Sequence, residues 1–158
     1  MKRLLVFILF ISLVLSYTAI SYEYLHDIFE NDIERIYIYS NCKSNLENIR
    51  SMPNGCGEIL CVDINDVGCI IDKLSSIAGE CLLVSNEYSI EDIVGALSLN
   101  ILETVEINDG VLITGHTNKL PTSIFSNSTK INIQIYKSGP KMLIGYPLIL
   151  QGFWNLYV

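Results

Sequence analysis

The segment that most constrains the fold is INIQIYKSGPKMLIGYPLIL, residues 131–150. Its first arm alternates apolar and polar residues, which is typical of a β-strand with one buried face. A turn within Lys137–Pro140 leads into a second arm that is apolar even where alternation requires polar residues. A strand that is apolar on both sides is covered on both sides or docks a partner with one of them. The segment therefore predicts a β-hairpin whose second strand has two apolar faces, each of which needs a cover or a partner.

The position of the turn also predicts how the two arms pair. The expected cross-strand pairs are Ile135–Met142, Ile133–Ile144 and Ile131–Tyr146. Asn132, Gln134 and Tyr136 then lie on the opposite face of the sheet. Pro147 cannot donate a hydrogen bond to a neighbouring strand, so the second strand is expected to meet an edge or a bulge there.

Upstream of this hairpin, the hydrophobic pattern predicts further strands and two helices. Strands are expected at residues 33–40, 58–64 and 80–85, and helices at residues 65–78 and 89–99. Asn65 is the expected N-cap of the first helix and Gly79 its C-terminal glycine. Ser89 and Asp92 have the spacing of a capping box that starts the second helix. Residues 41–57 are expected to form a loop, and residues 22–32 a short helix or an irregular segment.

Residues 101–117 predict another hairpin, with its turn at Asn108–Gly110. A three-residue loop with Gly110 in the left-handed conformation places Val105 opposite Ile113, so that apolar side chains share a face. Together these elements predict an α+β fold, a largely antiparallel sheet with helices packed on one face. We expect a single α+β domain at residues 22–158, which is long enough to enclose its own core.

Residues 1–21 have the features of a secretory signal. Two basic residues precede an apolar run from Leu4 to Leu15, and small residues follow. Cleavage is expected after Ser21. The alternative is an uncleaved membrane anchor, although a span needs about 20 apolar residues and this run is shorter. In both cases the protein is expected to be exported, either secreted or anchored to the outer face of the cytoplasmic membrane.

The charge of the chain argues against one class of partner. The formal net charge is −7, and loss of Lys2 and Arg3 with the signal leaves 8 basic and 17 acidic residues, a net charge of −9. Nucleic acids and anionic lipids bind proteins through lysines and arginines that neutralise phosphates. We therefore expect no nucleic-acid partner, and membrane contact only through residues 1–21 if they are uncleaved.

Five cysteines are present, and none of them has Cys-x-x-Cys spacing. Cys42 and Cys56 flank the predicted loop and are the best candidates for a disulfide, while the pairing state of all five stays open. Cys61 and Cys81 fall in predicted strands, where a cysteine is most often a small core residue. Cys69 lies away from the apolar stripe of the first helix.

Few residues are suited to catalysis. His26 lies in the N-terminal lead-in, and His116 ends a predicted strand, where a histidine is usually a hydrogen-bonded surface residue. The residues also allow a hydrolase that pairs Cys56 or Cys69 with His116, although nothing in the sequence specifies that they meet. No catalytic residue, cofactor site or metal site is predicted from the sequence motifs.

The C-terminal hairpin resembles the ending of the YwmB family, small exported proteins of spore-forming Gram-positive bacteria. The matching residues are Asn132, Ile133, Gln134, Ile135, Ile144, Gly145, Pro147 and Leu148. The resemblance implies a TATA-binding-protein-like fold, a curved antiparallel sheet with helices on its convex side. It brings no catalytic residues, and a fold by itself does not assign a function.

Two classes of function follow. The favoured one is a non-enzymatic envelope module that binds a protein or a wall component through its sheet or its C-terminal arm. The other is an enzyme of unrecognised type that uses a Cys/His pair. The apolar arm and the terminal GFWNLYV favour the first, with Phe153, Trp154 and Tyr157 expected to cover the arm or to form a docking rim.

Overall fold

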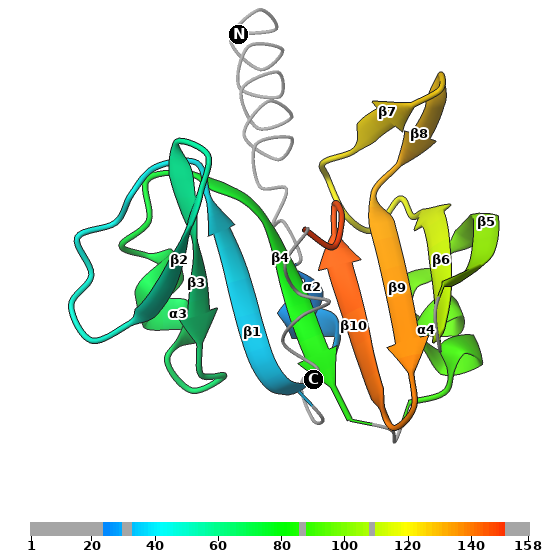
Figure 1. The fold of residues 1–158 in the computed structure, drawn as a ribbon, viewed down its shortest axis with the longest axis horizontal. Coiled ribbons are helices and arrows are strands. Elements are labelled where there is room, and N and C mark those ends of the chain that lie inside the picture. Colours follow the sequence, from blue (N-terminus) through cyan, green and yellow to red (C-terminus); the bar gives the residue numbers. More distant parts are fainter. Residues whose placement is uncertain (1–23, 30–32, 86–87, 108–109, 151–158) are drawn as a thin grey trace, which may run out of the picture.

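The computed structural model describes residues 24–29, 33–85, 88–107 and 110–150. Most of them belong to one eight-stranded antiparallel sheet (Figure 1). Its strands are β1 (Ile33–Ser40), β2 (Arg50–Asn54), β3 (Gly57–Val62), β4 (Ile77–Val84), β5 (Asn100–Ile107), β6 (Gly110–His116), β9 (Ile133–Ser138) and β10 (Lys141–Tyr146). A separate small hairpin consists of β7 (Ile124–Ser126) and β8 (Thr129–Ile131). The helices are α2 (Leu25–Ile28), α3 (Val67–Ile71) and α4 (Ile90–Leu97).

The sheet has the strand order β2-β3-β1-β4-β10-β9-β6-β5, and each neighbouring pair is antiparallel. Strands β1 to β4 form one half and strands β5, β6, β9 and β10 the other. The pairing of β4 with β10 joins the two halves at the centre. The predicted α+β class, with a largely antiparallel sheet, is confirmed.

One face of the sheet is covered by the three helices, which lie behind it in the view of Figure 1. Alternation along β1 directs Ile36 and Ile38 to this helix face and Tyr37 and Tyr39 to the other. The core on the helix face includes these buried residues: Leu25 and Phe29, Val67 and Ile70, Ile93 and Leu97, packed on Leu60, Leu82, Ile133, Ile135, Met142 and Ile144.

The second face, opposite the helices, has a smaller core that explains the apolar character of β10. Leu143 is buried there, and the chain after β10 turns back so that Ile149 packs over the same face. The backbone N–H of Ile149 donates a hydrogen bond to Oε1 of Gln134, at 3.1 Å. Gly145 leaves the room for this return, since a Cβ there would lie 2.5 Å from the nitrogen of Ile149. The arm is therefore covered on both sides.

Several predicted elements are confirmed. The strand at residues 33–40 has those bounds, and the strands at 58–64 and 80–85 correspond to β3 and β4. The second helix is α4, and Ser89 is its N-cap: its side chain accepts a hydrogen bond from the backbone of Asp92. The segment 22–32 contains the short helix α2. Phe153, Trp154 and Tyr157, the predicted cover of the arm, lie outside the described residues.

The first predicted helix is too long. Instead of spanning residues 65–78, α3 ends at Ile71, and β4 already begins at Ile77. Gly79 is not a helix terminus but part of β4, paired with Tyr39 of β1. Pairing with the sheet thus overrides the helical spacing of the apolar residues in this segment. The N-cap position is occupied by Asp66, one residue after Asn65.

The predicted loop at residues 41–57 contains strand β2, which the sequence did not indicate. Its Pro53 and Asn54 suggested a turn, but they pair with β3, and the turn is formed by Gly55 and Cys56. Proline is tolerated because β2 is at the edge of the sheet, where one side of the strand needs no hydrogen bonds. Conversely, β10 ends at Tyr146 directly before Pro147 and lies inside the sheet, not at an edge.

Both predicted hairpin registers are wrong. In the last hairpin Ile135 lies opposite Ile144 instead of Met142, a shift of two residues that keeps every side chain on its predicted face. In the other hairpin, Val105 lies opposite Leu112 instead of Ile113. This one-residue shift places Val105 on the second face. Gly110 pairs with both Ile107 and Ser138, and it is not among the positive-φ residues of the described chain.

Within the described residues, no helix has the length and apolar composition needed to cross a membrane. The segment 1–21, for which a signal or an anchor is predicted, lies outside them.

Candidate binding surface

The structure separates the residues of the predicted Cys/His enzyme. His116 is at the end of β6, and Cys56 is in the turn between β2 and β3. In the sheet order β3 and β6 are five positions apart, which corresponds to about 24 Å at the usual strand spacing. Cys69 lies in α3, which follows β3, and no hydrogen bond joins a cysteine to a histidine in the described part of the chain. The arrangement offers no activated thiol near His116.

None of the five cysteines forms a disulfide, so the expected Cys42–Cys56 bridge is absent and both residues are exposed. Cys81 is fully buried on the second face, as predicted for a core cysteine, and burial raises the pKa of its thiol to about 12. Cys61 is half-buried, and Cys69 is exposed, as its position off the helical stripe predicted. The buried thiol of Cys81 is protonated and unsuited to nucleophilic attack.

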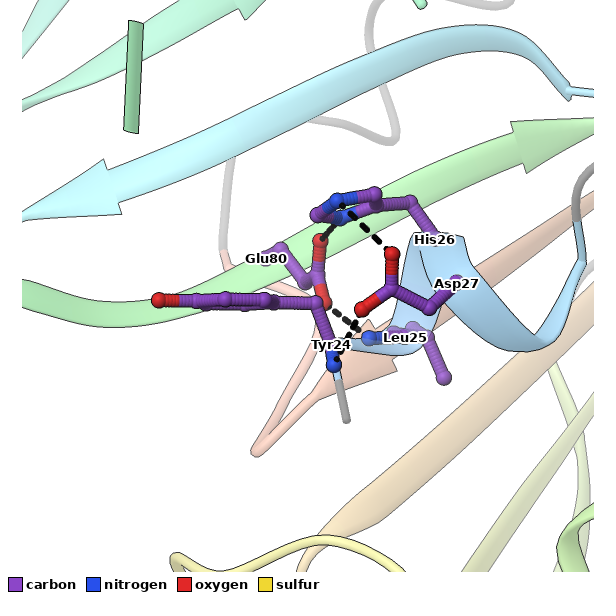
Figure 2. A network of polar contacts seen from close by, with 5 residues as sticks. All are labelled: Tyr24, Leu25, His26, Asp27 and Glu80. Carbon is purple, nitrogen blue, oxygen red and sulfur yellow. Dashed lines mark hydrogen bonds and ion pairs between the residues drawn. The ribbon is translucent and has the colours of Figure 1, made fainter. Parts of the chain in front are cut away.

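A buried polar network lies between α2 and the centre of the sheet (Figure 2). Glu80 of β4 is 2% exposed on the helix face. One of its carboxylate oxygens accepts a hydrogen bond from the backbone N–H of Leu25, and the other lies 2.7 Å from Nδ1 of His26. The ring of Tyr24 stacks on the His26 ring with 5.3 Å between the centroids. Asp27 accepts a hydrogen bond from the backbone N–H of Tyr24 and closes the turn.

This network stabilises the contact between α2 and β4. Burial lowers the pKa of His26, while the hydrogen bond and the charge of Glu80 raise it by more, so that the net shift is upward. The ion pair therefore fixes α2 to β4. Sequence analysis missed it, because His26 and Glu80 are 54 residues apart and each is unremarkable in its own segment. A glutamate in a strand that is otherwise apolar was the one available signal.

A pocket of about 290 Å³ adjoins this network. The described residues that line it are Tyr24, Ile77, Ala78, Gly79, Pro121, Thr122 and Tyr146. The hydroxyl of Tyr146 is engaged there, because it accepts a hydrogen bond of 2.7 Å from the backbone N–H of Thr122. These residues include no carboxylate, histidine or cysteine, and their polar side-chain groups are the hydroxyls of Tyr24, Thr122 and Tyr146.

The strongest binding feature is the edge strand β5. It is the last strand in the sheet order, so one side of its backbone pairs with no other strand of the described chain. Every residue from Asn100 to Glu106 is exposed. Three of them are large and apolar: Ile101, Leu102 and Val105 are 44%, 40% and 39% exposed. An edge of this length without proline or lysine is a ready template for another strand.

The hairpin of β7 and β8 extends this surface. It projects past the end of the sheet beside β6 (Figure 1), and its Phe125 is 74% exposed. A pocket of about 330 Å³ lies between β5 and this hairpin and is lined by Leu102, Glu103, Thr114, Ser126, Asn127, Thr129 and Ile131. The four exposed large apolar side chains of the described chain are thus all on β5 and β7. We call β5 together with this hairpin the β5 surface.

Strand β5 lies in an acidic part of the chain, whereas the hairpin beside it carries one exposed cation, Lys130. Residues 74–118 contain seven acidic residues and no lysine or arginine. Two of the acids, Glu103 and Glu106, are exposed on β5 itself. They point to opposite faces of the sheet, because Glu103 pairs with Thr114 and Glu106 with Val111. A partner strand would therefore meet negative charge on both of its faces.

No group of three or more His, Cys, Asp and Glu side chains within residues 24–29, 33–85, 88–107 and 110–150 is placed to hold a metal ion. Comparison of the chain with protein-family models, with curated proteins and with solved structures gave no match. The resemblance to the YwmB family and to the TATA-binding-protein-like fold accordingly stays a prediction.

Proposed function

We propose that the protein is an exported, non-enzymatic envelope module that binds a partner protein by accepting an extended basic segment along β5. The observation that supports this most directly is the exposure of an eight-residue edge strand with three large apolar side chains. In strand addition, main-chain hydrogen bonds supply affinity and the alternate side chains supply specificity.

The opposite edge of the sheet is unsuited to this role. Strand β2 has five residues, and its Pro53 lacks a backbone donor. Short length and proline are the usual devices that protect an edge from pairing. β5 has neither, and its exposed valine, leucine and isoleucine are favoured in strand addition.

The charge of β5 indicates the chemistry of the partner. A second copy of this chain would add the two glutamates of its own β5 to an edge that already carries two, and like charges across a strand pair are destabilising. A segment with two lysines or arginines three positions apart would instead place one basic side chain on each face and pair favourably with both glutamates. We therefore propose a basic β-strand as the ligand, with Leu102 and Phe125 providing apolar contacts at one end of it.

The test uses a labelled eight-residue peptide of valine and threonine with lysines at its third and sixth positions, so that one lysine lies on each face, and a peptide with glutamates at the same two positions for comparison. The basic peptide should bind with an affinity that falls as salt is added. Val105→Lys should weaken binding at least tenfold, whereas Ser51→Lys, a matched change at an exposed position of the other edge, should not. Equal binding of the two peptides, or equal loss in the two variants, would refute the proposal. A concentration-dependent dimer that excludes the peptide would instead assign β5 to self-association.

A further inference from the structure

The second face carries a pocket of about 340 Å³ at the end of the sheet away from β5. Its lining residues are Glu34, Arg35, Tyr37, Arg50, Met52, Cys61, Leu83 and Lys141. They come from strands β1, β2, β3, β4 and β10. We call it the arginine pocket.

Strand register explains why these side chains converge. Arg50 lies opposite Cys61, and Cys61 lies opposite Tyr37, so the three residues share the second face in one row across β2, β3 and β1. Arg35 is two residues before Tyr37 on the same face and lies opposite Leu83 of β4. Tyr37 and Leu83 are buried, and they form an apolar floor beneath the two guanidinium groups.

The pocket is lined by more cations than carboxylates, although the chain as a whole is acidic. Lys141 pairs with Glu34 at 3.3 Å. Nη1 of Arg35 lies 3.7 Å from the sulfur of Cys61, and neither Arg35 nor Arg50 forms an ion pair with a described residue. The lining thus holds three cations and one carboxylate.

Other carboxylates occur near the two arginines. An adjoining pocket of about 370 Å³ shares Glu34, Arg35, Arg50 and Cys61, and it is also lined by Asp63 and Asp66. No salt bridge links these aspartates to the arginines in the described chain. Both guanidinium groups therefore keep donors available for an external anion.

We propose that the arginine pocket binds a phosphate monoester that carries an apolar chain. Guanidinium groups present paired N–H donors that match phosphate oxygens, and two of them with an ammonium group suit a doubly charged anion better than a single carboxylate. The apolar floor of Tyr37 and Leu83, with Met52 at its side, accommodates the first methylene groups of the chain. The ligand is a single molecule and not a bilayer surface, because the net charge of −7 opposes approach to anionic lipid. This site is separate from the β5 surface.

The probe is octyl phosphate below its micellar concentration, and its affinity for the protein is measured by calorimetry. Inorganic phosphate and octyl trimethylammonium are measured separately for comparison. Octyl phosphate should bind, inorganic phosphate should bind at least tenfold more weakly, and the cation should not bind. Arg35→Gln and Arg50→Gln should each weaken binding of octyl phosphate at least tenfold; both side chains are exposed, so folding should be retained. Lys130→Gln, which removes an exposed cation on β8, is the matched control and should bind as the native protein does.

Three outcomes would overturn this proposal. If Lys130→Gln weakens binding of octyl phosphate as much as Arg50→Gln does, the binding would be due to general charge attraction. Equal affinity for inorganic phosphate and octyl phosphate would remove the role of the apolar floor. Binding to vesicles of phosphatidic acid without binding of monomeric octyl phosphate would assign the cations to a membrane surface. Failure of the basic peptide at β5 would leave the arginine pocket unaffected, so the two proposals can be judged separately.

Discussion

At the scale of single residues, Glu80 and His26 show how a buried charge is tolerated in an apolar sheet. The carboxylate of Glu80 has two partners, the backbone N–H of Leu25 and the ring of His26, and all three belong to the contact between α2 and β4. A buried charge that loses its partner costs about 3 to 5 kcal/mol. We therefore expect His26→Leu to destabilise the protein by an amount of this order, measured by urea denaturation at pH 6.

The same pair should make stability depend on pH. The pKa of His26 is raised in the folded protein, chiefly by Glu80 acting against burial. A group whose folded pKa is raised contributes fully below its ordinary pKa, about 6.5, and the contribution is lost as the pH rises through the folded value. The free energy of unfolding should therefore fall as the pH rises above about 6.5. The His26→Gln variant should lack this slope, and an unchanged slope would mean that His26 is not its source.

At the scale of elements, the sequence predicted best where local signals agreed with the sheet. Strand β1 was found because its isoleucines and tyrosines alternate between two covered faces, and α4 because Ser89 caps it. The end of α3 and the hairpin registers were missed for a common reason. Both depend on strands distant in the sequence: β1 fixes where β4 starts, and β9 fixes the position of Gly110.

The capping box of α4 gives an element-scale prediction. The hydroxyl of Ser89 accepts a hydrogen bond from the backbone N–H of Asp92 at 3.0 Å, and the Asp92 carboxylate accepts one from the backbone N–H of Ser89. Loss of such a cap costs about 1 kcal/mol. Ser89→Ala should lower the free energy of unfolding by about this amount. Ser75→Ala, at an exposed position for which no side-chain hydrogen bond is seen in the described chain, should change it by less than half as much.

The return of the chain over β10 gives a second element-scale prediction. A Cβ on Gly145 would lie 2.5 Å from the nitrogen and 2.6 Å from Cγ1 of Ile149. Gly145→Ala should therefore displace Ile149 from the second face and destabilise the protein by about 1 to 3 kcal/mol, the range for overpacking. Gly95→Ala is the control, since its site in α4 is open and alanine is the better helix former, so this variant should be as stable as the native protein or more so. A stable Gly145→Ala protein would contradict the packing described for this segment.

At the scale of the whole molecule, the candidate site lies elsewhere than the sequence suggested. The apolar arm at residues 141–150 was expected to be covered or to dock a partner. The structure places its strand β10 in the middle of the sheet and packs Ile149 over the second face of that strand. Three of the four exposed large apolar residues of the described chain are on β5, where the predicted register would have opposed Val105 to Ile113 on a covered face. Exposure of an edge depends on the order of strands in the sheet, and that order is set by long-range pairing that no local pattern reveals.

The position of α2 leads to a prediction about the mature chain. The proposed signal ends at Ser21, three residues before Tyr24, so cleavage there would keep the whole contact between α2 and β4. A protein consisting of residues 22–158 should therefore unfold at the same urea concentration as the full chain. Removal of residues 1–29 should lower stability by several kcal/mol, because the buried side chains of Leu25 and Phe29 contribute about 1.5 to 3 kcal/mol each. It would also leave the Glu80 carboxylate buried without its partners.

The intact mass of the native protein should match residues 22–158. A mass that includes residues 1–21 would make the protein membrane-anchored, and an unchanged stability after removal of residues 1–29 would show that α2 is dispensable for the fold.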